Sequence, residues 1–447
     1  MEAVAGLFDG AWTILSFLVV LSIVVFVHEY GHYIVGRWCG IGAEAFSVGF
    51  GKELYGWTDR RGTRWKISVL PLGGYVKFLG DADAASTVKD EAEWARLTAE
   101  QRAHSFHDAS VGRRALTVLA GPGANFVMSI IVFALMALAT GAPSSAPVVG
   151  GLGEDLNPAF RRDVAVGDRI TAVDGAPVED FSALTAALVS AGGEPVTLTL
   201  ERDGAPMTVE TVYDPPARVD GVTPGGPAEE AGLAAGDRIV AAEGEPLSGF
   251  GELQSRVAAA GDAPITLTVR RNDESFEATL TPRMVETPDP ATGETARRPL
   301  IGVQKQATEL SPVVQSVGPI GALQSGVERT WTVIALSVSG LWEVVTGAQD
   351  AAEVLGGPVR IAELSGEAAS AGLATFVGLI AVLSASIGLI NLFPVPVLDG
   401  GHLMFYAYEA ARGRPVRPQW QEIGNRIGLA LVLGLMLFAT FNDIARL

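Results

Sequence analysis

The sequence Val25-Phe26-Val27-His28-Glu29-Tyr30-Gly31-His32 ends an apolar run, Ala11–Val27, that contains no charged residue. Histidines four residues apart on a helix lie on the same face, one turn above the other. Both imidazoles can then reach one metal ion, and Glu29 is placed to take a proton from an attacking water. Ionisable groups inside a membrane-length apolar segment are costly and usually functional. The stretch therefore predicts a zinc site with His28 and His32 as ligands and Glu29 as the catalytic base. A helix-end cluster of histidines facing lipid headgroups accounts poorly for this spacing.

The composition indicates a membrane protein with several units. The chain has 447 residues, 48% of them hydrophobic, and a mean hydropathy of +0.31 that is concentrated in blocks. This length is too great for one soluble core and is enough for three or four units. A net charge of −18 argues against a nucleic-acid partner. The single cysteine, Cys39, excludes an intramolecular disulfide.

Four apolar blocks are predicted to cross the membrane. They are Phe8–Gly36, Ala115–Thr140, Leu373–Leu398 and Ile427–Phe441. Twelve Lys or Arg residues lie from Arg37 to Arg114, so the positive-inside rule places this loop in the cytoplasm and both termini outside. The loop Ala407–Arg426 is cytoplasmic by the same rule.

A fifth apolar segment, Trp331–Trp342, has only twelve residues and is bracketed by Arg329 and Glu343. It is too short to span, so it predicts an amphipathic helix on the membrane surface, about Thr330–Val345. If this segment does not span, the following block runs from outside to inside. Asp399 then comes level with the two histidines and completes a three-ligand zinc site.

The block that delivers Asp399 ends in Asn391-Leu392-Phe393-Pro394-Val395-Pro396-Val397-Leu398-Asp399-Gly400. The two prolines predict a break in the helix, which is tolerable at membrane depth only beside a cavity or other protein. In the first cytoplasmic loop, Ala45–Phe50 and Arg64–Val69 alternate as strands do and precede the pair Gly73-Gly74. We expect a small sheet or hairpin over about residues 45–80, lying against the membrane helices.

An internal repeat follows the second span. Val166–Gly175 recurs as Ala235–Gly244, 69 positions later, and each copy precedes a helix-like stretch and alternating strands. The helix-like stretches are Phe181–Ser190 and Phe250–Ala260. The pattern resembles two tandem PDZ domains, which bind extended chains at a sheet edge. A role as rigid spacers is the alternative. Between Gly141 and Leu300 we count 26 acidic and 12 basic residues, which accounts for most of the net charge.

Four motifs together resemble the site-2 protease family of intramembrane zinc metalloproteases, and among its members those with tandem PDZ domains. The motifs are His28–His32, Pro71–Lys77, Gly121–Phe126 and Asn391–Gly400. The resemblance implies Zn²⁺ held by His28, His32 and Asp399, with Glu29 as base. It also implies substrate contacts at Asn391, Gly73, Gly74, Pro394 and Pro396.

The predicted fold is therefore a polytopic α-helical membrane protein with about four transmembrane helices, a membrane-associated β-hairpin and two inserted α/β PDZ domains. The expected units are a first catalytic half (1–140), two PDZ domains (141–215 and 216–305), a linker with the surface helix (306–370) and a second catalytic half (371–447).

The predicted function is intramembrane zinc endoproteolysis of membrane-anchored regulators, such as an anti-sigma factor already trimmed by a site-1 protease. Substrates would be single-span proteins in a bacterial inner membrane, with the PDZ domains on the periplasmic side and possible binders of a peptide or substrate ectodomain. One alternative is a membrane-tethered PDZ scaffold without activity. Another is an anchored protease whose active site lies in water.

Overall fold

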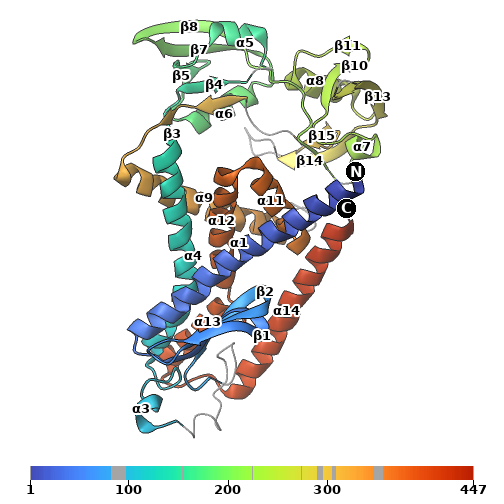
Figure 1. Cartoon of the computed structure of the whole chain (residues 1–447). Coiled ribbons are helices and arrows are strands. Elements are labelled where there is room, and N and C mark those ends of the chain that lie inside the picture. Colours follow the sequence, from blue (N-terminus) through green and yellow to red (C-terminus); the bar gives the residue numbers. More distant parts are fainter. Residues whose placement is uncertain are drawn as a thin grey trace. The chain divides into compact units, whose positions relative to one another are not determined.

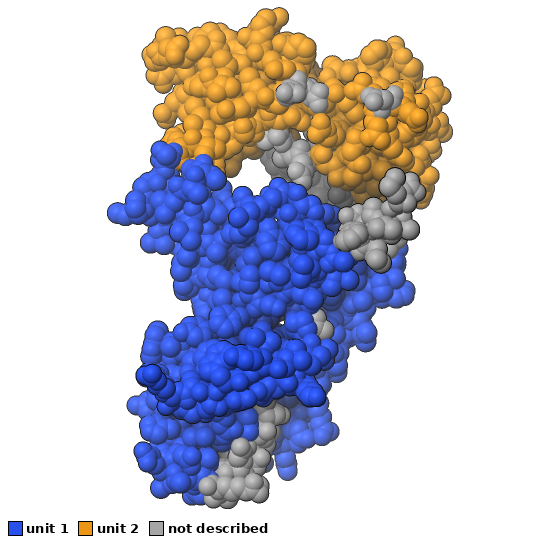
Figure 2. Space-filling view, in the orientation of Figure 1, with its two compact units in different colours: residues 1–141, 316–447 blue, residues 142–315 orange. Residues whose placement is uncertain are grey.

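The protein folds into two compact units, which Figure 2 colours separately. The computed structural model describes residues 2–81, 97–153, 156–223, 225–272, 274–288, 295–304, 309–346 and 356–445. Unit 1 comprises Met1–Gly141 and Ser316–Leu447, and unit 2 comprises Ala142–Gln315. Unit 2 is thus an insertion between the two halves of unit 1.

Unit 1 is helical, and four of its described helices are long and apolar enough to cross a membrane. These are α1 (Glu2–Trp38), α4 (Val111–Thr140), α12 (Leu373–Asn391) and α14 (Pro418–Ala445). They match the four blocks predicted from the sequence. The other described helices are α3 (Ala99–Arg102), α9 (Pro319–Thr346), α11 (Pro358–Ala371) and α13 (Asp399–Arg412).

The four long helices alternate in direction, and both termini lie at the same end of unit 1 (Figure 1). Contacts between side chains agree with this arrangement. His32, near the end of α1, meets Thr117, near the start of α4, so these two helices are antiparallel. Asp399, which follows α12, meets His28 of α1, so α1 and α12 run in the same direction.

Small residues bring the central helices close together. A Cβ atom built on Gly31 of α1 would lie 2.3 Å from the carbonyl oxygen of Ala120 in α4. A Cβ on Gly326 of α9 would lie 2.4 Å from the carbonyl oxygen of Ile130, also in α4. Backbones can approach this closely only where side chains are absent. Helix α4 is therefore in close backbone contact with both α1 and α9.

Helix α9 is longer than the sequence pattern predicted. It has 28 residues and begins at Pro319, well before the expected Thr330. Its buried residues, Ala322, Ser325, Gly326 and Thr330, precede the apolar segment and face α4, where the hydroxyls of Thr330 and Ser129 are 3.0 Å apart. The short uncharged run was only the second half of the helix. As predicted, α9 is not among the candidate spans.

The predicted hairpin is present as β1 (Ala43–Thr58) and β2 (Arg64–Phe78), paired antiparallel with several register shifts. One face packs on α1: Phe46 is fully buried, 5.8 Å from the Tyr33 ring and 4.4 Å from the Trp65 ring. The far end exposes large side chains such as Leu54 and Tyr55. The hairpin thus covers the end of α1 that carries the histidines.

Unit 2 contains the repeat as two four-stranded antiparallel sheets of identical order. In the first repeat the order is β6-β5-β7-β8, from Ala176–Pro177, Arg169–Val173, Pro195–Arg202 and Ala205–Val212. In the second it is β11-β10-β12-β13, from Glu245–Pro246, Arg238–Ala242, Ile265–Arg271 and Glu274–Leu280. The repeat helices, α6 (Phe181–Ser190) and α8 (Phe250–Ala260), begin and end where the sequence predicted.

Shorter elements complete unit 2. They are β3 (Ala142–Pro143), β4 (Val149–Leu152), α5 (Pro158–Asp163), β9 (Gly221–Val222), α7 (Pro227–Glu230), β14 (Arg283–Pro288), β15 (Thr295–Leu300), β16 (Val303–Gln304), β17 (Leu310–Pro312) and β18 (Val314–Gln315). The repeated aspartates have equivalent partners: Asp168 pairs with Arg202, and Asp237 pairs with Arg271. The recurring sequence therefore reflects a recurring buried carboxylate held by an arginine.

The end of unit 2 returns to the first repeat. Strand β17 pairs with β4, β18 pairs with β3, and Leu310 belongs to the buried core of the first repeat. The sequence had suggested that a linker begins at position 306. The structure instead places residues 310–315 in unit 2, because they supply edge strands to the first repeat. The two ends of the insertion are consequently neighbours, with Gln315 opposite Ala142.

Candidate metal centre

Three side chains from distant parts of the sequence converge where α1 meets the start of α13. The Nε2 atoms of His28 and His32 are 3.2 Å apart. The Oδ2 atom of Asp399 is 3.2 Å from the first and 3.5 Å from the second. Both histidines are only 9% exposed. As the sequence predicted, Asp399 lies level with the two histidines.

These distances fit a tetrahedral zinc ion. Zn²⁺ bound at about 2.0–2.1 Å by nitrogen and oxygen requires ligand atoms roughly 3.3 Å apart. In the part of the chain that the structure describes, these three residues form the group whose ligand atoms could share one metal ion. The Oδ2 atom of Asp399 is buried without a hydrogen-bond partner there. Such an atom is costly to leave unpaired, and a cation would satisfy it.

The outer ring nitrogens of both histidines have partners that fix the tautomer. His32 Nδ1 lies 2.9 Å from the carbonyl oxygen of Thr117, which can only accept. Nδ1 therefore carries the proton, and the Nε2 lone pair faces the site. His28 Nδ1 lies 3.3 Å from the side-chain amide of Asn125. Asn125 thus makes an interhelical hydrogen bond to a candidate ligand.

A half turn of the Asn125 amide gives His28 the same tautomer. The nitrogen of the amide faces His28, while its buried oxygen has no partner among the described residues. Amide nitrogen and oxygen are interchangeable by a half turn. With the oxygen turned toward His28, Nδ1–H donates to it and the orphaned atom is satisfied. The Nε2 lone pair of His28 then also faces the site.

Gly121 explains part of the motif Gly121–Phe126. A Cβ atom on Gly121 would lie 2.2 Å from His32 Nε2. The imidazole of His32 therefore occupies the space that a side chain at position 121 would fill. Gly123, two positions on, faces open space, since a Cβ there would have no neighbour within 4 Å. Only the first glycine of the motif makes room for the site.

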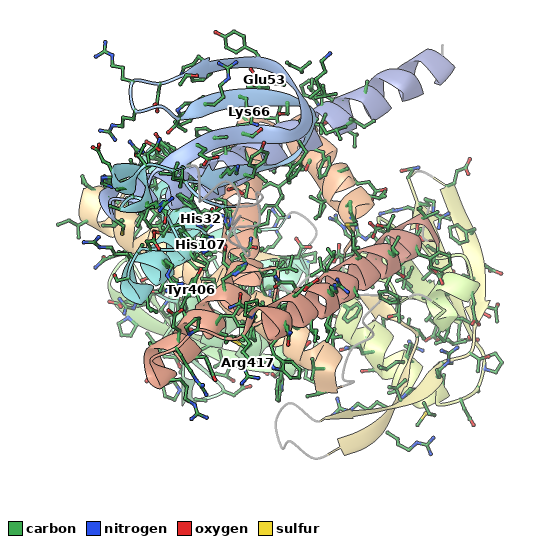
Figure 3. The ribbon with its side chains drawn as sticks, turned by 90° about the horizontal axis from the view of Figure 1, so that it is seen from below. His32, Glu53, Lys66, His107, Tyr406 and Arg417 are labelled. Carbon is green, nitrogen blue, oxygen red and sulfur yellow. The ribbon has the colours of Figure 1, made fainter. Side chains whose placement is uncertain are left out.

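A cavity of ≈ 220 Å³ opens onto the three candidate ligands. Figure 3 views the molecule from below and labels His32 and Tyr406, which both line the cavity. The full lining consists of His28, Glu29, His32, Val76, Phe78, Phe106, Val118, Asn391, Val397, Asp399, His402 and Tyr406. Glu29 thus faces the same space as the ligands, as a base must.

Strand β2 lies directly over Glu29. The backbone of Val76 makes a hydrogen bond to the Glu29 carboxyl group. A Cβ atom on Gly74 would lie 3.2 Å from Glu29 Cγ and 2.7 Å from the carbonyl oxygen of Ser47. Gly73 has φ +148, and a Cβ there would strike the Phe50 ring. The glycine pair therefore lies beside the candidate base without lining the cavity.

The break after α12 shapes the other wall. Asn391, the last residue of α12, lines the cavity, and its side-chain amide donates to the carbonyl oxygen of Ile387. Pro394 and Pro396 do not line it. Pro396 instead packs on α14, where a Cβ atom on Gly428 would lie 1.7 Å from its carbonyl oxygen. Val397 lines the cavity with φ +103, a strained conformation for a β-branched residue that costs about 1–3 kcal/mol.

Sequence reasoning missed two polar residues of the lining, His402 and Tyr406. Both lie on α13 outside the spans. Burial lowers the pKa of His402, partly opposed by Asp399, and burial raises the pKa of Tyr406. The guanidinium of Arg114 lies 5.0 Å from the Tyr406 ring centroid and 2.7 Å from Glu409. The signal available in the sequence was the spacing of three residues from Asp399 to His402 and of four from His402 to Tyr406, which places these side chains on one helix face.

Comparison with known proteins agrees with this geometry. Residues 16–435 match the model of peptidase family M50. The chain belongs to peptidase family M50. It is 40% identical over 434 residues to the candidate zinc metalloprotease Atu1380 of Agrobacterium fabrum, covering 97% of this chain and 96% of the relative. It is 34% identical over 462 residues to the regulator of sigma-E protease RseP of Salmonella typhimurium, covering 98% and 99%.

Membership of family M50 makes the protein a metalloendopeptidase of the site-2 protease type. The predicted membership of the site-2 protease family is confirmed by the match over nearly the whole chain. The relatives' names imply zinc as its metal. The four apolar helices are consistent with a multi-pass protein of the bacterial inner membrane.

The contact between Gly121 and His32 gives a test of the metal centre of this M50 protease. We expect Gly121→Ala to reduce zinc content to well below one ion per chain, because the added methyl displaces His32 Nε2. Gly123→Ala is the matched control and should retain zinc, since its methyl meets nothing. Metal analysis of the purified proteins, with circular dichroism to verify folding, makes the measurement. Full zinc content in a folded Gly121→Ala variant would contradict the assignment of His32.

Proposed function

We propose that the protein cuts peptide bonds of membrane-anchored substrates within the membrane, with zinc held by His28, His32 and Asp399. The observation that carries this proposal is that three largely buried candidate ligands and Glu29 face one cavity at the end of apolar helices. When bound, zinc would polarise the scissile carbonyl and increase the acidity of the attacking water.

The side chains of the cavity have distinct roles in this proposal. Glu29 takes a proton from the attacking water as the new C–O bond forms, and it passes that proton to the departing amine as the C–N bond breaks. Thr117 and Asn125 orient the two histidines. The apolar residues Val76, Phe78 and Val118 exclude bulk water from the cavity, which strengthens the electrostatic interactions inside it.

The substrate is proposed to bind as an extended strand. A substrate cannot be cut while it is helical, because its carbonyl groups accept hydrogen bonds within the helix and are inaccessible. An unwound substrate segment could lie beside the hairpin near Gly73 and Gly74. Its backbone N–H and C=O groups would then make hydrogen bonds to the hairpin. The closeness of Gly74 to Glu29 supports this position, since a strand added there would lie close to the base. Single-span regulators such as anti-sigma factors are the proposed substrates, by analogy with the name of the Salmonella relative.

Replacement of Glu29 separates this enzyme from an inactive PDZ scaffold. We expect Glu29→Gln to bind about one zinc per chain but to lose cleavage of a membrane-anchored reporter, because only the base is removed. His28→Ala and Asp399→Ala should lose zinc as well. Metal analysis and reporter cleavage in membranes measure both properties. Absence of zinc from the wild type would favour the scaffold, and substantial turnover by Glu29→Gln would reject Glu29 as the base.

The orientation in the membrane is also part of the proposal. We place both termini and unit 2 on the periplasmic side, and the hairpin and the α13–α14 connection on the cytoplasmic side. The abundance of Lys and Arg between Arg37 and Arg114 supports this orientation.

Labelling of single cysteines tests the orientation. In a Cys39→Ala background, a cysteine at the exposed position Glu210 should react with an impermeant thiol reagent in intact spheroplasts. A cysteine at Arg414, equally exposed, should react only after the membrane is opened. Reaction of the second cysteine in intact spheroplasts would refute the topology.

We further propose that unit 2 is a pair of PDZ domains that admits trimmed substrates and excludes substrates with a folded ectodomain. Its repeated sheets and helices support the PDZ assignment. Unit 2 is joined directly to a membrane helix, because α4 ends at Thr140 and unit 2 begins at Ala142. Binding of substrate by the domains is not required for such exclusion.

Deletion of unit 2 tests exclusion against recruitment. The paired ends of β3 and β18 allow Ala142–Gln315 to be replaced by a short flexible linker, and removal of the whole unit leaves no strand without its partner. We expect cleavage of an untrimmed substrate to rise while cleavage of the trimmed form is retained. If the deletion protein binds zinc but no longer cuts the trimmed form, unit 2 recruits substrate and the exclusion model is wrong.

A further inference from the structure

His402 shares the cavity with the candidate metal ligands but is not one of them. Among the described residues, the ligand atoms that all lie within 4.8 Å of one another belong to His28, His32 and Asp399. His402 lines the same cavity from α13, three residues after Asp399. Residues three apart on a helix are neighbours on one face. The second half of the chain therefore presents a carboxylate and an imidazole side by side to the same space.

The start of α13 is held tightly, so His402 has a defined position. A Cβ atom on Gly400 would lie 2.2 Å from the carbonyl oxygen of Leu392, and one on Gly401 would lie 2.4 Å from that of Val395. The two glycines let the first turn of α13 pack directly on the chain that precedes it. Asp399 and His402 are positioned together by this contact.

The imidazole of His402 is available to a substrate. His28 and His32 each have both ring nitrogens engaged, and the Asn391 amide donates within its own helix. In the described part of the chain, neither ring nitrogen of His402 makes a hydrogen bond. Helical side chains lean toward the N-terminus of their helix, which here is the end at Asp399. Tyr406, one turn further on, lines the same cavity.

We propose that His402 is a further catalytic residue, which donates a hydrogen bond to the scissile carbonyl oxygen as that oxygen gains negative charge. This inference rests on the proposed function. When water adds to the carbonyl carbon, the π electron pair moves to oxygen, and it returns when the C–N bond breaks and the amine leaves with the proton from Glu29. Donors placed at such an oxygen are among the strongest contributors to catalysis. Burial lowers the pKa of His402, so the ring is a neutral donor.

The experiment compares His402→Ala and His402→Gln with wild type in the full-length purified protein. The control is Met404→Ala, which changes a half-exposed residue of the same helix. A fluorogenic peptide of membrane-span length that wild type cleaves gives kcat and KM. A phosphinic analogue of that peptide, which resembles the tetrahedral state, gives an inhibition constant. Metal analysis gives the zinc content.

We expect His402→Ala to lose about 100-fold in kcat and a similar factor in affinity for the phosphinic analogue, with KM and zinc content unchanged. His402→Gln, which keeps an N–H donor, should recover part of this loss, and Met404→Ala should resemble wild type. A decrease in kcat at unchanged KM indicates that the lost interaction is made in the transition state.

Three results would overturn the inference. Loss of zinc in both His402 variants would make His402 a ligand or a structural support. An increase in KM at constant kcat would make it a ground-state contact. A kcat within threefold of wild type would give it no role. In each of these three cases the proposed function still stands if the wild type cleaves the peptide and requires Glu29. A wild type without zinc or without cleavage would reject both the proposed function and the role of His402.

Discussion

The structure depends on one electrostatic constraint, which is the convergence of two imidazole lone pairs and a carboxylate oxygen among apolar helices. Three acceptors within 3.2–3.5 Å of one another repel unless a cation lies among them. The surrounding contacts all serve to maintain this arrangement. Thr117 and Asn125 hold the outer nitrogens of the rings, and the hairpin covers the remaining side.

The main features of the catalytic half could be predicted because they follow from strong physical signals. Ionisable residues are rare in membrane-length apolar segments, so His28, Glu29 and His32 could be predicted to form a functional site. The distribution of Lys and Arg predicted the direction of the first spans. Because Trp331–Trp342 is too short to span, the predicted direction of the third span brought Asp399 level with the histidines, 367 residues after His32. Likewise, the helices of the two repeats were visible because they recur at a fixed interval.

Other features could not be predicted because they depend on contacts between segments distant in the sequence. In the sequence, Gly121 cannot be distinguished from a glycine that only allows helices to pack closely. Its role becomes visible only from the position of His32 Nε2 beside it. The first half of α9 carries Glu328 and Arg329 and shows no apolar run, yet its small residues pack on α4. Strands β17 and β18 have three and two residues, too few for any periodic pattern. His402 was overlooked because its spacing from Asp399 indicates a shared helix face but not that both side chains line one cavity.

The insertion of unit 2 between the halves of unit 1 has a consequence for biosynthesis. Ribosomes add roughly 5–20 residues per second, so the stretch from His32 to Asp399 takes on the order of 20–70 s to synthesise. During that interval the nascent chain holds two of the three proposed ligands, together with Glu29. Two histidines without the carboxylate form an incomplete zinc site. With the proposed ligands, the order of synthesis delays completion of the zinc site until nine-tenths of the polypeptide has been made.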